Sequence, residues 1–387
     1  MSRLARLKNR LQHALIWRRH RLVRAKQRSQ HPLRYLFLEV TRQCNLACAY
    51  CGSSCTGKPA EGGELSVPEW IEAITRIAAD FPAGQIMVAV TGGEPLLKDG
   101  IFDLFDALRR LGYRFGMVSN GQLLDAEAAR KLVRSGIGSI SMSMDGPPEV
   151  NDALRGRGSS DKVAAAIRHL HDAGYRGKLE IISTLTQPSV ATLETMRRWI
   201  AAQRVPLWRV APVMPIGRAA ERADLVPDGT DVRAILEYLL AARKDGFVPK
   251  PEFGEEGYLG RRYEGHVRPY LCQCNAGISV AGIRHDGRIA ACPELSDAFD
   301  QGHVKQDRFK DVWENGYQCM RDRSWARKSG PCADCEHWDD CQGGALHLYE
   351  APGQPFLRCF WKMLADEKGA PLAETPKPQA WYAGPGA

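Results

Sequence analysis

Six short runs rich in β-branched and aromatic residues alternate with stretches of helical periodicity, and this alternation restricts the fold more than any other feature. The runs lie at residues 35–40, 85–90, 114–119, 139–144, 179–183 and 207–212, and the helical stretches at residues 67–81, 101–111, 125–135, 161–173 and 190–203. Such alternation is typical of parallel strands joined by right-handed helical crossovers. Six units are too few to close an eight-stranded barrel, so we predict an open, partial (β/α)6 barrel of the TIM type in the α/β class.

Composition excludes several other classes of protein. The chain has 387 residues, of which 44% are hydrophobic and 25% charged, as in folded globular chains rather than disordered ones. No apolar run is long enough to span a membrane, and the N-terminus lacks the pattern of a signal peptide. We therefore expect a cytoplasmic location, where the twelve cysteines serve as metal ligands rather than as disulfides.

The positive charge of the chain is concentrated at its N-terminus. Residues 1–35 hold eleven Lys and Arg and no acidic residue, so the rest of the chain has 42 basic and 45 acidic residues. Leucines recur at helical spacing among these arginines, which predicts a basic amphipathic helix over residues 1–34. They are Leu4, Leu7, Leu11 and Leu15. Such a helix can lie on an anionic membrane surface, contact nucleic acid or bind an acidic partner, or simply pack its leucines on the main domain.

The first group of cysteines directly follows the first predicted strand. Cys44, Cys48 and Cys51 form a Cys-x3-Cys-x2-Cys loop. Thiolates at these spacings can converge on one iron-sulfur cluster, and three ligands leave one iron open for chemistry. The alternative is a structural zinc knuckle with Cys55 as fourth ligand.

A second group of cysteines lies beyond residue 271, which implies a separate metal-binding region. Its members are Cys272, Cys274, Cys292, Cys319, Cys332, Cys335, Cys341 and Cys359. Asp286-Gly287 between short β-like runs predicts a two-residue hairpin turn that presents Cys292 at a strand end. A structural zinc ribbon is the alternative for the last four cysteines. Cys55 and Cys319 are expected to be buried free thiols.

Other polar motifs also follow predicted strands, at the edge where parallel sheets carry their chemistry. Thr91-Gly92-Gly93-Glu94-Pro95 follows the second strand, and its glycines would let the backbone approach a ligand ammonium group. The third and fourth strands end in Ser119-Asn120 and in Ser143-Met-Asp145. Each motif taken alone is equally compatible with a simple turn or cap.

On the three-cysteine loop, with the aromatic Tyr50 before its last cysteine, residues 35–215 resemble the radical S-adenosylmethionine (radical SAM) superfamily. The resemblance implies a [4Fe-4S] cluster on Cys44, Cys48 and Cys51 that binds S-adenosylmethionine and cleaves it reductively to a 5′-deoxyadenosyl radical. It also implies a set of cofactor-binding residues. These are Tyr50, Gly92, Gly93, Glu94, Pro95, Ser119, Asn120, Ser143 and Asp145.

The second cysteine group resembles a SPASM domain, the auxiliary iron-sulfur module of peptide-modifying radical enzymes. The resemblance implies one auxiliary cluster on Cys332, Cys335, Cys341 and Cys359, and a further one on Cys292 with Cys272, Cys274 or both. Ala345 stands where that pattern has another cysteine, so the further cluster is expected to be open, smaller or absent. The expected parts are thus the basic helix (1–34), the radical SAM core (35–215), a helical bridge (216–265), the cysteine-rich module (266–362) and a loose tail (363–387).

The resemblance implies an enzyme that abstracts hydrogen from a ribosomally made peptide or protein, with a reductant such as flavodoxin or ferredoxin as electron donor. One alternative is a radical SAM enzyme acting on a small molecule, as in cofactor or haem biosynthesis. An alternative of another class is a non-catalytic, metal-stabilised nucleic-acid binder using the basic N-terminus. The sequence does not identify a catalytic residue; Glu294, close to Cys292, is a candidate proton acceptor.

Overall fold

The computed structural model describes residues 3–60, 62–328, 330–354 and 356–365, with side chains from residue 15 onward. Its strands are β1 (Tyr35–Glu39), β2 (Met87–Thr91), β3 (Arg114–Ser119), β4 (Ser139–Ser143), β5 (Lys178–Leu185), β6 (Leu207–Pro212), β7 (Lys250–Phe253), β8 (Val280–Ile283), β9 (Arg288–Ala290) and β10 (Gly302–His303). Within these ranges the strands form one sheet in the order β10-β9-β8-β1-β2-β3-β4-β5-β6-β7. Strands β1 to β7 pair in parallel, and β8 pairs in parallel with β1.

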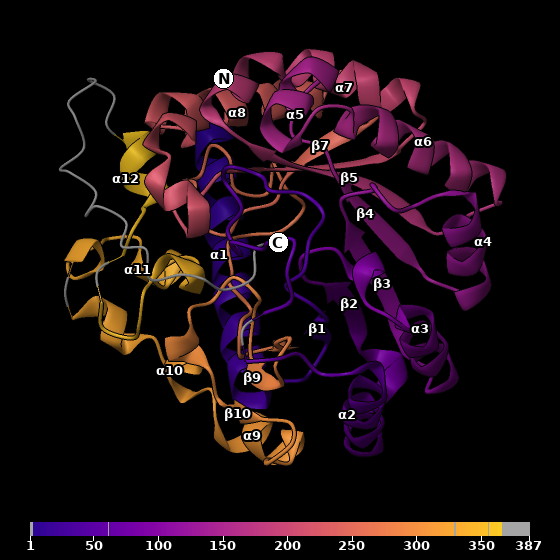
Figure 1. Cartoon of the computed structure of the whole chain (residues 1–387). Helices are drawn as coiled ribbons and strands as arrows, with labels where there is room; N and C mark the ends of the chain where they lie inside the picture. Colours follow the sequence, from indigo (N-terminus) through magenta and orange to yellow (C-terminus); the bar gives the residue numbers. More distant parts are fainter. Residues whose placement is uncertain (1–2, 61, 329, 355, 366–387) are drawn as a thin grey trace.

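The described residues also form twelve α-helices, of which only some cover the outer face of this curved sheet. They are α1 (Arg3–Gln30), α2 (Val67–Asp80), α3 (Ile101–Arg110), α4 (Ala126–Ser135), α5 (Pro148–Arg155), α6 (Ser159–Asp172), α7 (Leu193–Ala202), α8 (Gly229–Ala242), α9 (Phe309–Asn315), α10 (Gln318–Arg321), α11 (Trp338–Cys341) and α12 (Phe360–Ala365). Figure 1 shows α2, α3, α4, α6 and α7 along the outer rim. Local sequence starts several of them: Ser66 and Glu69 form a capping box at α2, and Asp125 accepts from the backbone of Ala128 at α4.

The predicted partial barrel is confirmed, and the structure adds a strand at each edge of the six. The expected helical bridge over residues 216–265 contains α8, but describing it as helical throughout is wrong, because it also contains β7 beside β6. Pro251 and two charged residues in this four-residue strand conceal any apolar alternation. The other unforeseen parallel strand, β8, belongs to the cysteine-rich module and joins that module to the core sheet.

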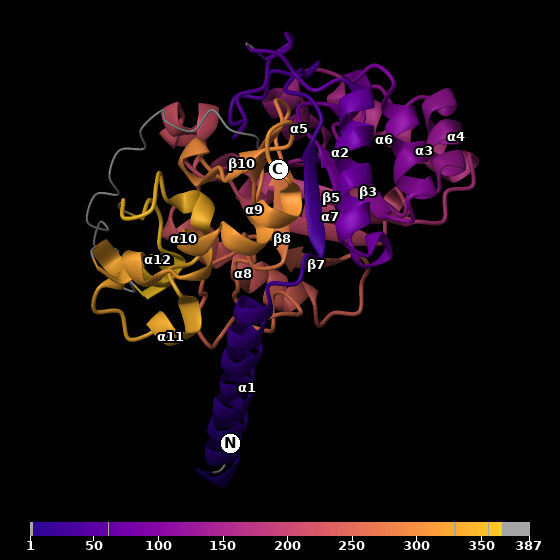
Figure 2. The ribbon, with the colours of Figure 1, turned by 90° about the horizontal axis from the view of Figure 1, so that it is seen from below.

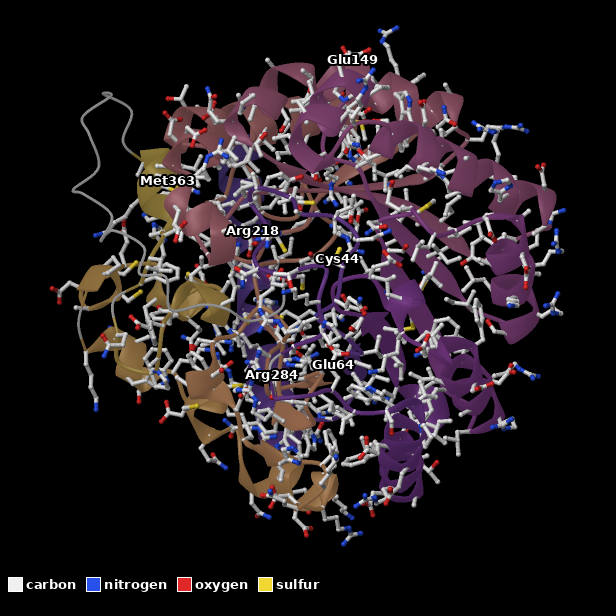
Figure 3. All side chains as sticks on the ribbon, viewed as in Figure 1. Cys44, Glu64, Glu149, Arg218, Arg284 and Met363 are labelled. Carbon is white, nitrogen blue, oxygen red and sulfur yellow. The ribbon has the colours of Figure 1, made fainter. Side chains whose placement is uncertain are left out.

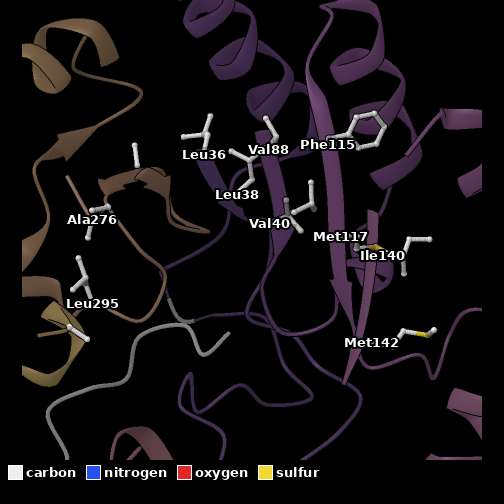
Figure 4. Close-up of a cluster of buried hydrophobic side chains, with 14 of the residues drawn as sticks. Leu36, Leu38, Val40, Val88, Phe115, Met117, Ile140, Met142, Ala276 and Leu295 are labelled. Atoms are coloured by element: carbon white, nitrogen blue, oxygen red, sulfur yellow. The ribbon is translucent and has the colours of Figure 1, made fainter. Parts of the chain in front are cut away.

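A continuous apolar core connects the sheet to the C-terminal module. Leu36, Val88 and Ile140 are fully buried and come from neighbouring parallel strands. Figure 4 shows these side chains in the same cluster as Ala276 and Leu295 of the module. The module therefore has no separate core of its own at this contact, and the two cysteine regions are held in a fixed arrangement.

The N-terminal end of helix α1 extends away from the remainder of the protein, as Figure 2 shows. The side chains of Leu4, Leu7 and Leu11 lie outside the described residues, while Leu15 is 63% exposed. Packing of the predicted leucine face on the main domain is thus wrong at Leu15; Trp17, 3% exposed, is buried instead. In the part of the chain that the structure describes, no helix has the length and apolarity needed to cross a membrane.

The hairpin around Asp286 is present, but its loop is longer than predicted. Strands β8 and β9 are antiparallel with Ile283 opposite Ile289, and the Arg284 backbone N–H donates to the Arg288 carbonyl at 2.9 Å. The loop therefore has three residues, with Gly287 at φ 100° where a glycine is needed. Helix α12 reaches Ala365, three residues into the predicted loose tail, and residues 366–387 lie outside the described part.

Candidate active site

The cysteine loop that follows β1 packs tightly against the Gly-Gly-Glu-Pro turn that follows β2. A Cβ atom on Gly92 would lie 2.2 Å from the Thr41 carbonyl oxygen, and one on Gly93 would lie 2.3 Å from that of Gln43. The Gly93 backbone N–H donates to Thr41 at 2.7 Å. The close approach that these glycines permit is thus to the segment that carries the cysteine loop.

The sulfur atoms of the loop lie among polar and cationic groups. The Asn120 side-chain amide donates to Cys44 Sγ at 3.6 Å, and Arg155 Nη1 lies 4.0 Å from Cys48 Sγ. Burial raises the pKa of the Cys44 thiol to about 11. A hydrogen bond from Cys55 lowers the pKa of Cys51. A bound cation would convert the buried thiols to thiolates, and the nearby donors would then stabilise the negative sulfurs.

These surroundings fit an iron-sulfur cluster on Cys44, Cys48 and Cys51. The three thiols are near enough to influence one another's ionisation, and they approach from one loop. Among the described residues, no three or more His, Cys, Asp or Glu side chains are arranged around a single metal-ion position.

Arg218, from the segment after β6, fixes the cysteine loop from the opposite side. Its Nε donates to the Cys48 carbonyl at 2.8 Å and its Nη1 to the Cys55 carbonyl at 2.8 Å. Gly217 has φ +56°, and a Cβ there would lie 2.2 Å from the Gly52 carbonyl oxygen. Figure 3 shows Cys44 and Arg218 near the middle of the molecule. The sequence analysis did not predict these contacts of Arg218. The available signal was Gly217, a glycine shortly after a predicted strand.

Glu94 is fully buried and joins the ends of β2 and β3. Its carboxylate accepts from the Ser119 hydroxyl at 3.0 Å, from the Asn120 backbone N–H at 2.7 Å and from the Leu96 backbone N–H at 3.2 Å. Burial raises the pKa of Glu94 to about 7, although these hydrogen bonds oppose the rise. The predicted residues Glu94, Ser119 and Asn120 are therefore brought together next to Cys44.

A second buried network surrounds Asp145 after β4. The Tyr50 hydroxyl and Arg155 Nε both donate to Asp145 Oδ2, and the Thr184 backbone N–H donates to Oδ1 at 2.6 Å. Arg155, at the end of α5, was not foreseen because the sequence analysis assigned no helix to residues 148–155. Two further predicted residues complete this edge of the sheet: Ser143 is half-buried at the end of β4, and Pro95 is buried in the turn after β2.

The cysteines of the C-terminal module divide into two groups. Cys332 is near enough to Cys335, Cys341 and Cys359 for their charges to affect its pKa, which burial raises to about 12. Cys272 is hydrogen-bonded to Cys341 and is thus not beside Cys292. The other group contains Cys274 and Cys292, which interact electrostatically. All twelve cysteines are free thiols; Cys55 is buried as predicted, whereas Cys319 is half-buried.

Acidic residues and a histidine lie beside Cys292. Nδ1 of His347 is 3.4 Å from Glu294 Oε2, and its Nε2 is 3.5 Å from Glu255 Oε1. Burial raises the pKa of Glu255 and that of Cys292, and Glu294 adds to the rise at Cys292. Ala345, which replaces the expected cysteine, is fully buried. The structure thus joins the predicted Glu294 to Glu255 and His347, neither of which carried a signal in the sequence.

Comparison with known families agrees with this division into two regions. The sequence model of the radical SAM superfamily matches residues 38–199, and that of an iron-sulfur cluster-binding domain, SPASM, matches residues 272–336.

Characterised relatives cover most of the chain. The mycofactocin maturase MftC of Mycobacterium tuberculosis (strain ATCC 25618 / H37Rv) is 30% identical over 328 residues, which cover 82% of this chain and 79% of the relative. The AdoMet-dependent heme synthase of Nitratidesulfovibrio vulgaris is 26% identical over 331 residues, covering 81% and 88%.

Solved structures show the same fold. Native anSMEcpe with bound AdoMet superposes with a TM-score of 0.67 at 17% identity, covering 87% of this chain and 95% of that one. SuiB of Streptococcus suis bound to S-adenosylmethionine gives 0.64 at 18% identity, covering 84% and 76%.

The chain belongs to the radical SAM superfamily and carries its SPASM-type iron-sulfur module at the C-terminal side. It is therefore a radical SAM enzyme, and its cofactors are S-adenosylmethionine, a [4Fe-4S] cluster and auxiliary iron-sulfur clusters. These predictions are confirmed, and the alternative of a non-catalytic nucleic-acid binder is set aside.

Proposed function

We propose that this radical SAM enzyme is a maturase that modifies a ribosomally made peptide or protein by hydrogen abstraction. The observation that carries the proposal is the 30% identity to a maturase across both the core and the cysteine-rich module. The bound cofactors supply one-electron cleavage of S-adenosylmethionine to a 5′-deoxyadenosyl radical. The chain itself has to bind them, exclude water and position the peptide.

Within this proposal each strand-end residue has a separate task. Cys44, Cys48 and Cys51 hold the cluster, and the carboxylate of Glu94 holds the ammonium group of the methionine moiety. The Asp145 network fixes the opposite side of the pocket. Support comes from the burial of both carboxylates, after β2 and after β4 at one edge of the sheet, where water cannot compete with their hydrogen bonds.

Anaerobic turnover with a peptide tests the proposal. The protein is reconstituted with iron and sulfide, reduced with dithionite, and given S-adenosylmethionine and the short precursor peptide encoded nearest its gene. We expect 5′-deoxyadenosine and a mass change of the peptide, both absent from a variant with Cys44, Cys48 and Cys51 replaced by Ala. Release of 5′-deoxyadenosine with every candidate peptide unchanged would contradict the peptide substrate.

A small-molecule substrate is the second candidate. It is favoured by the 26% identity to an AdoMet-dependent heme synthase over a similar share of the chain. The same turnover with a haem-precursor tetrapyrrole in place of the peptide distinguishes the two. A mass change of the tetrapyrrole, with no change of the peptide, would replace the first proposal by the second.

We further propose the ligands of the auxiliary clusters. Cys332, Cys335, Cys341 and Cys359 hold one complete cluster, while Cys274 and Cys292 contribute to another that lacks a thiolate at Ala345. Support comes from the mutual proximity of the first four thiols. In this assignment Cys272 is hydrogen-bonded to Cys341 but is not itself a ligand of the first cluster.

Iron analysis separates these roles. Without Cys44, Cys48 and Cys51 the protein should retain iron-sulfur absorbance, and further replacement of Cys335 and Cys341 by Ala should remove about four iron atoms. Cys272→Ala should leave that iron in place. Stoichiometric zinc in place of iron would contradict the assignment and favour a zinc ribbon.

We also propose a partner for the exposed face of α1 and an electron donor. The exposed side chains Leu15, Ile16, Leu22 and Val23 lie among arginines, in a segment with no acidic residue, which favours contact with an anionic membrane surface. Co-sedimentation with phosphatidylglycerol vesicles, but not phosphatidylcholine vesicles, tests this, and Leu22→Glu should abolish it. Equal sedimentation with both, or with neither, would exclude the membrane role and leave an acidic partner. A flavodoxin or ferredoxin is the proposed reductant.

A further inference from the structure

The inner face of α1 packs on the cysteine-rich module, although the family match begins only at residue 38. Trp17 packs with Tyr258 and Cys272, with its ring centroid 5.6 Å from that of Tyr258. His20 Nε2 lies 3.3 Å from the Cys272 carbonyl oxygen. Two turns further along, Gln27 accepts from the Gln273 side chain at 2.9 Å. This face of α1 therefore covers the segment that carries Cys272 and Cys274.

Two arginines of the same face lie beside these cysteines, Arg24 buried and Arg28 half-buried. Arg24, 5% exposed, donates from Nη1 to the Asp340 carbonyl at 2.8 Å and from Nη2 to the Asp339 carbonyl. The carboxylates of those two aspartates pair instead with Arg21, at 3.4 Å for Asp340 and 3.8 Å for Asp339. Arg28 donates from Nη1 to the Gln342 side chain at 2.8 Å, and its Nε is buried with no hydrogen-bond partner among the described residues.

A third guanidinium group approaches from the module. Arg323, 3% exposed, donates to the Gly344 carbonyl at 2.8 Å and to the Cys274 carbonyl at 3.1 Å. Burial, and then repulsion by Arg323 and Arg24, lowers the pKa of Arg28 to about 10. Cys272, Asp340 and Cys341 are groups whose negative charge favours protonated Arg24. Asp322, and then Cys274, act likewise on Arg28.

The hydrogen bonds of these three guanidinium groups within the described residues thus go to neutral carbonyl and amide oxygens. A buried cation requires a counter-charge, since removal from water is otherwise very unfavourable. Before metal binds, the surrounding thiols supply only part of a counter-charge, as at Cys341, where a hydrogen bond from Cys272 lowers the pKa to about 7. An iron-sulfur cluster bound by four thiolates is an anion. An auxiliary cluster would add to the counter-charge that Asp340 supplies to Arg24 and Asp322 to Arg28.

We propose that Arg24 and Arg28, with Arg323, are positioning residues that form the counter-charge of the auxiliary iron-sulfur clusters, and that this attraction holds α1 as a cover over them. The inference rests on the auxiliary ligands proposed above. Reduction adds one electron from the external reductant and hence one more negative charge to a cluster. The guanidinium groups stabilise that reduced form, and their loss makes the reduction potential more negative.

Potentiometry of the auxiliary cluster tests the counter-charge. In protein with Cys44, Cys48 and Cys51 replaced by Ala, the remaining cluster is titrated with dithionite and its reduced form is followed by electron paramagnetic resonance. Arg24→Gln should shift the midpoint potential to more negative values. Arg24→Lys, which keeps the positive charge, should leave the midpoint close to that of the parent protein. Arg19→Gln is the matched control, because it removes the same charge from an exposed position of the same helix. Equal midpoints for Arg24→Gln and Arg19→Gln would overturn the proposal.

Hydrogen exchange of the otherwise unaltered enzyme tests the cover. Peptides from residues 15–30 should exchange more slowly in the reconstituted protein than in the iron-free protein, and Arg24→Gln with Arg28→Gln should remove that difference. The same exchange with and without iron would overturn the proposed cover. Absence of any iron signal from the parent triple-cysteine variant would instead contradict the ligand assignment, before an arginine is changed.

Discussion

The cysteines of the strand-end site come from the single loop between Cys44 and Cys51, whereas those of the C-terminal module come from segments spread between Cys272 and Cys359. The loop is held by its neighbours through backbone contacts: Gly92, Gly93 and Gly217 approach it so closely that a Cβ would collide with its carbonyl oxygens. The module has no comparable single loop, and α1 packs on it from the far end of the sequence.

This difference separates two ways of making a thiolate site. A ligand set on one loop keeps its spacing in the sequence, and the surrounding fold only has to fix the loop. A ligand set drawn from distant segments depends on tertiary packing, so a change far away in the sequence can alter it. The two sites should therefore respond differently to substitution, and the changes below are ordered by the size of the effect.

The largest effect is expected from a cysteine of the loop. Cys48→Ala should lower 5′-deoxyadenosine formation by more than about 100-fold. Loss of a residue that only hydrogen-bonds to a metal ligand can already cost up to about 100-fold, and Cys48 is itself a ligand. Cys341→Ala should leave the uncoupled cleavage of S-adenosylmethionine within a few-fold while abolishing modification of the substrate. Chromatography of the nucleoside product, with gel filtration to exclude misfolding, measures both. Equal loss of cleavage in the two variants would remove the distinction between the sites.

Arg155 should give the next largest effect, on stability. Arg155→Met leaves the fully buried Asp145 without its cation, and breaking a buried ion pair from one side costs about 3 kcal/mol or more. The midpoint of thermal unfolding should fall by several degrees. Arg157→Met is the control, because Arg157 is exposed two residues further along. Similar unfolding midpoints for the two variants would mean that the hydrogen bonds from Tyr50 and Thr184 stabilise the Asp145 carboxylate sufficiently without Arg155.

The two regions also differ in how far the sequence predicts them. Periodicity located β1 to β6 closely, and the loop spacing located Cys44, Cys48 and Cys51, because both signals are local. Arg218 and Arg155 were missed, since their roles depend on which chain segments the fold brings to the loop. In the module, the family resemblance grouped Cys292 with Cys272, Cys274 or both, whereas packing sets Cys272 against Cys341. Strand β7 was missed for the same reason, because a short polar edge strand is recognised by its neighbour rather than by its residues.

Glu94 offers a test that depends on pH. Its pKa is raised to about 7, so in the cofactor-free protein the carboxylate loses its charge as the pH falls through that value. Only the ionised form pairs with the ligand ammonium, so affinity for S-adenosylmethionine should rise about tenfold from pH 6 to pH 8 and then level off. Equilibrium dialysis of the reconstituted enzyme measures this affinity. Glu94→Gln should bind more weakly with little dependence on pH; a parallel pH profile in the variant would assign the dependence to another group.

The smallest effect is expected at Cys55, the thiol of the first region that has no place in the three-cysteine set. Cys55 is buried and its hydrogen bond lowers the pKa of Cys51, so it favours the thiolate of its neighbour before metal arrives. Cys55→Ala should therefore slow the incorporation of iron during reconstitution, while the loaded enzyme cleaves S-adenosylmethionine within about twofold of the unaltered protein, since a bystander makes no bond to the cluster. Cys55→Ser, which retains a hydrogen-bond donor at this position, should recover part of the loading rate. A variant that loads at the normal rate but no longer cleaves the cofactor would make Cys55 a ligand and the loop a four-thiolate site.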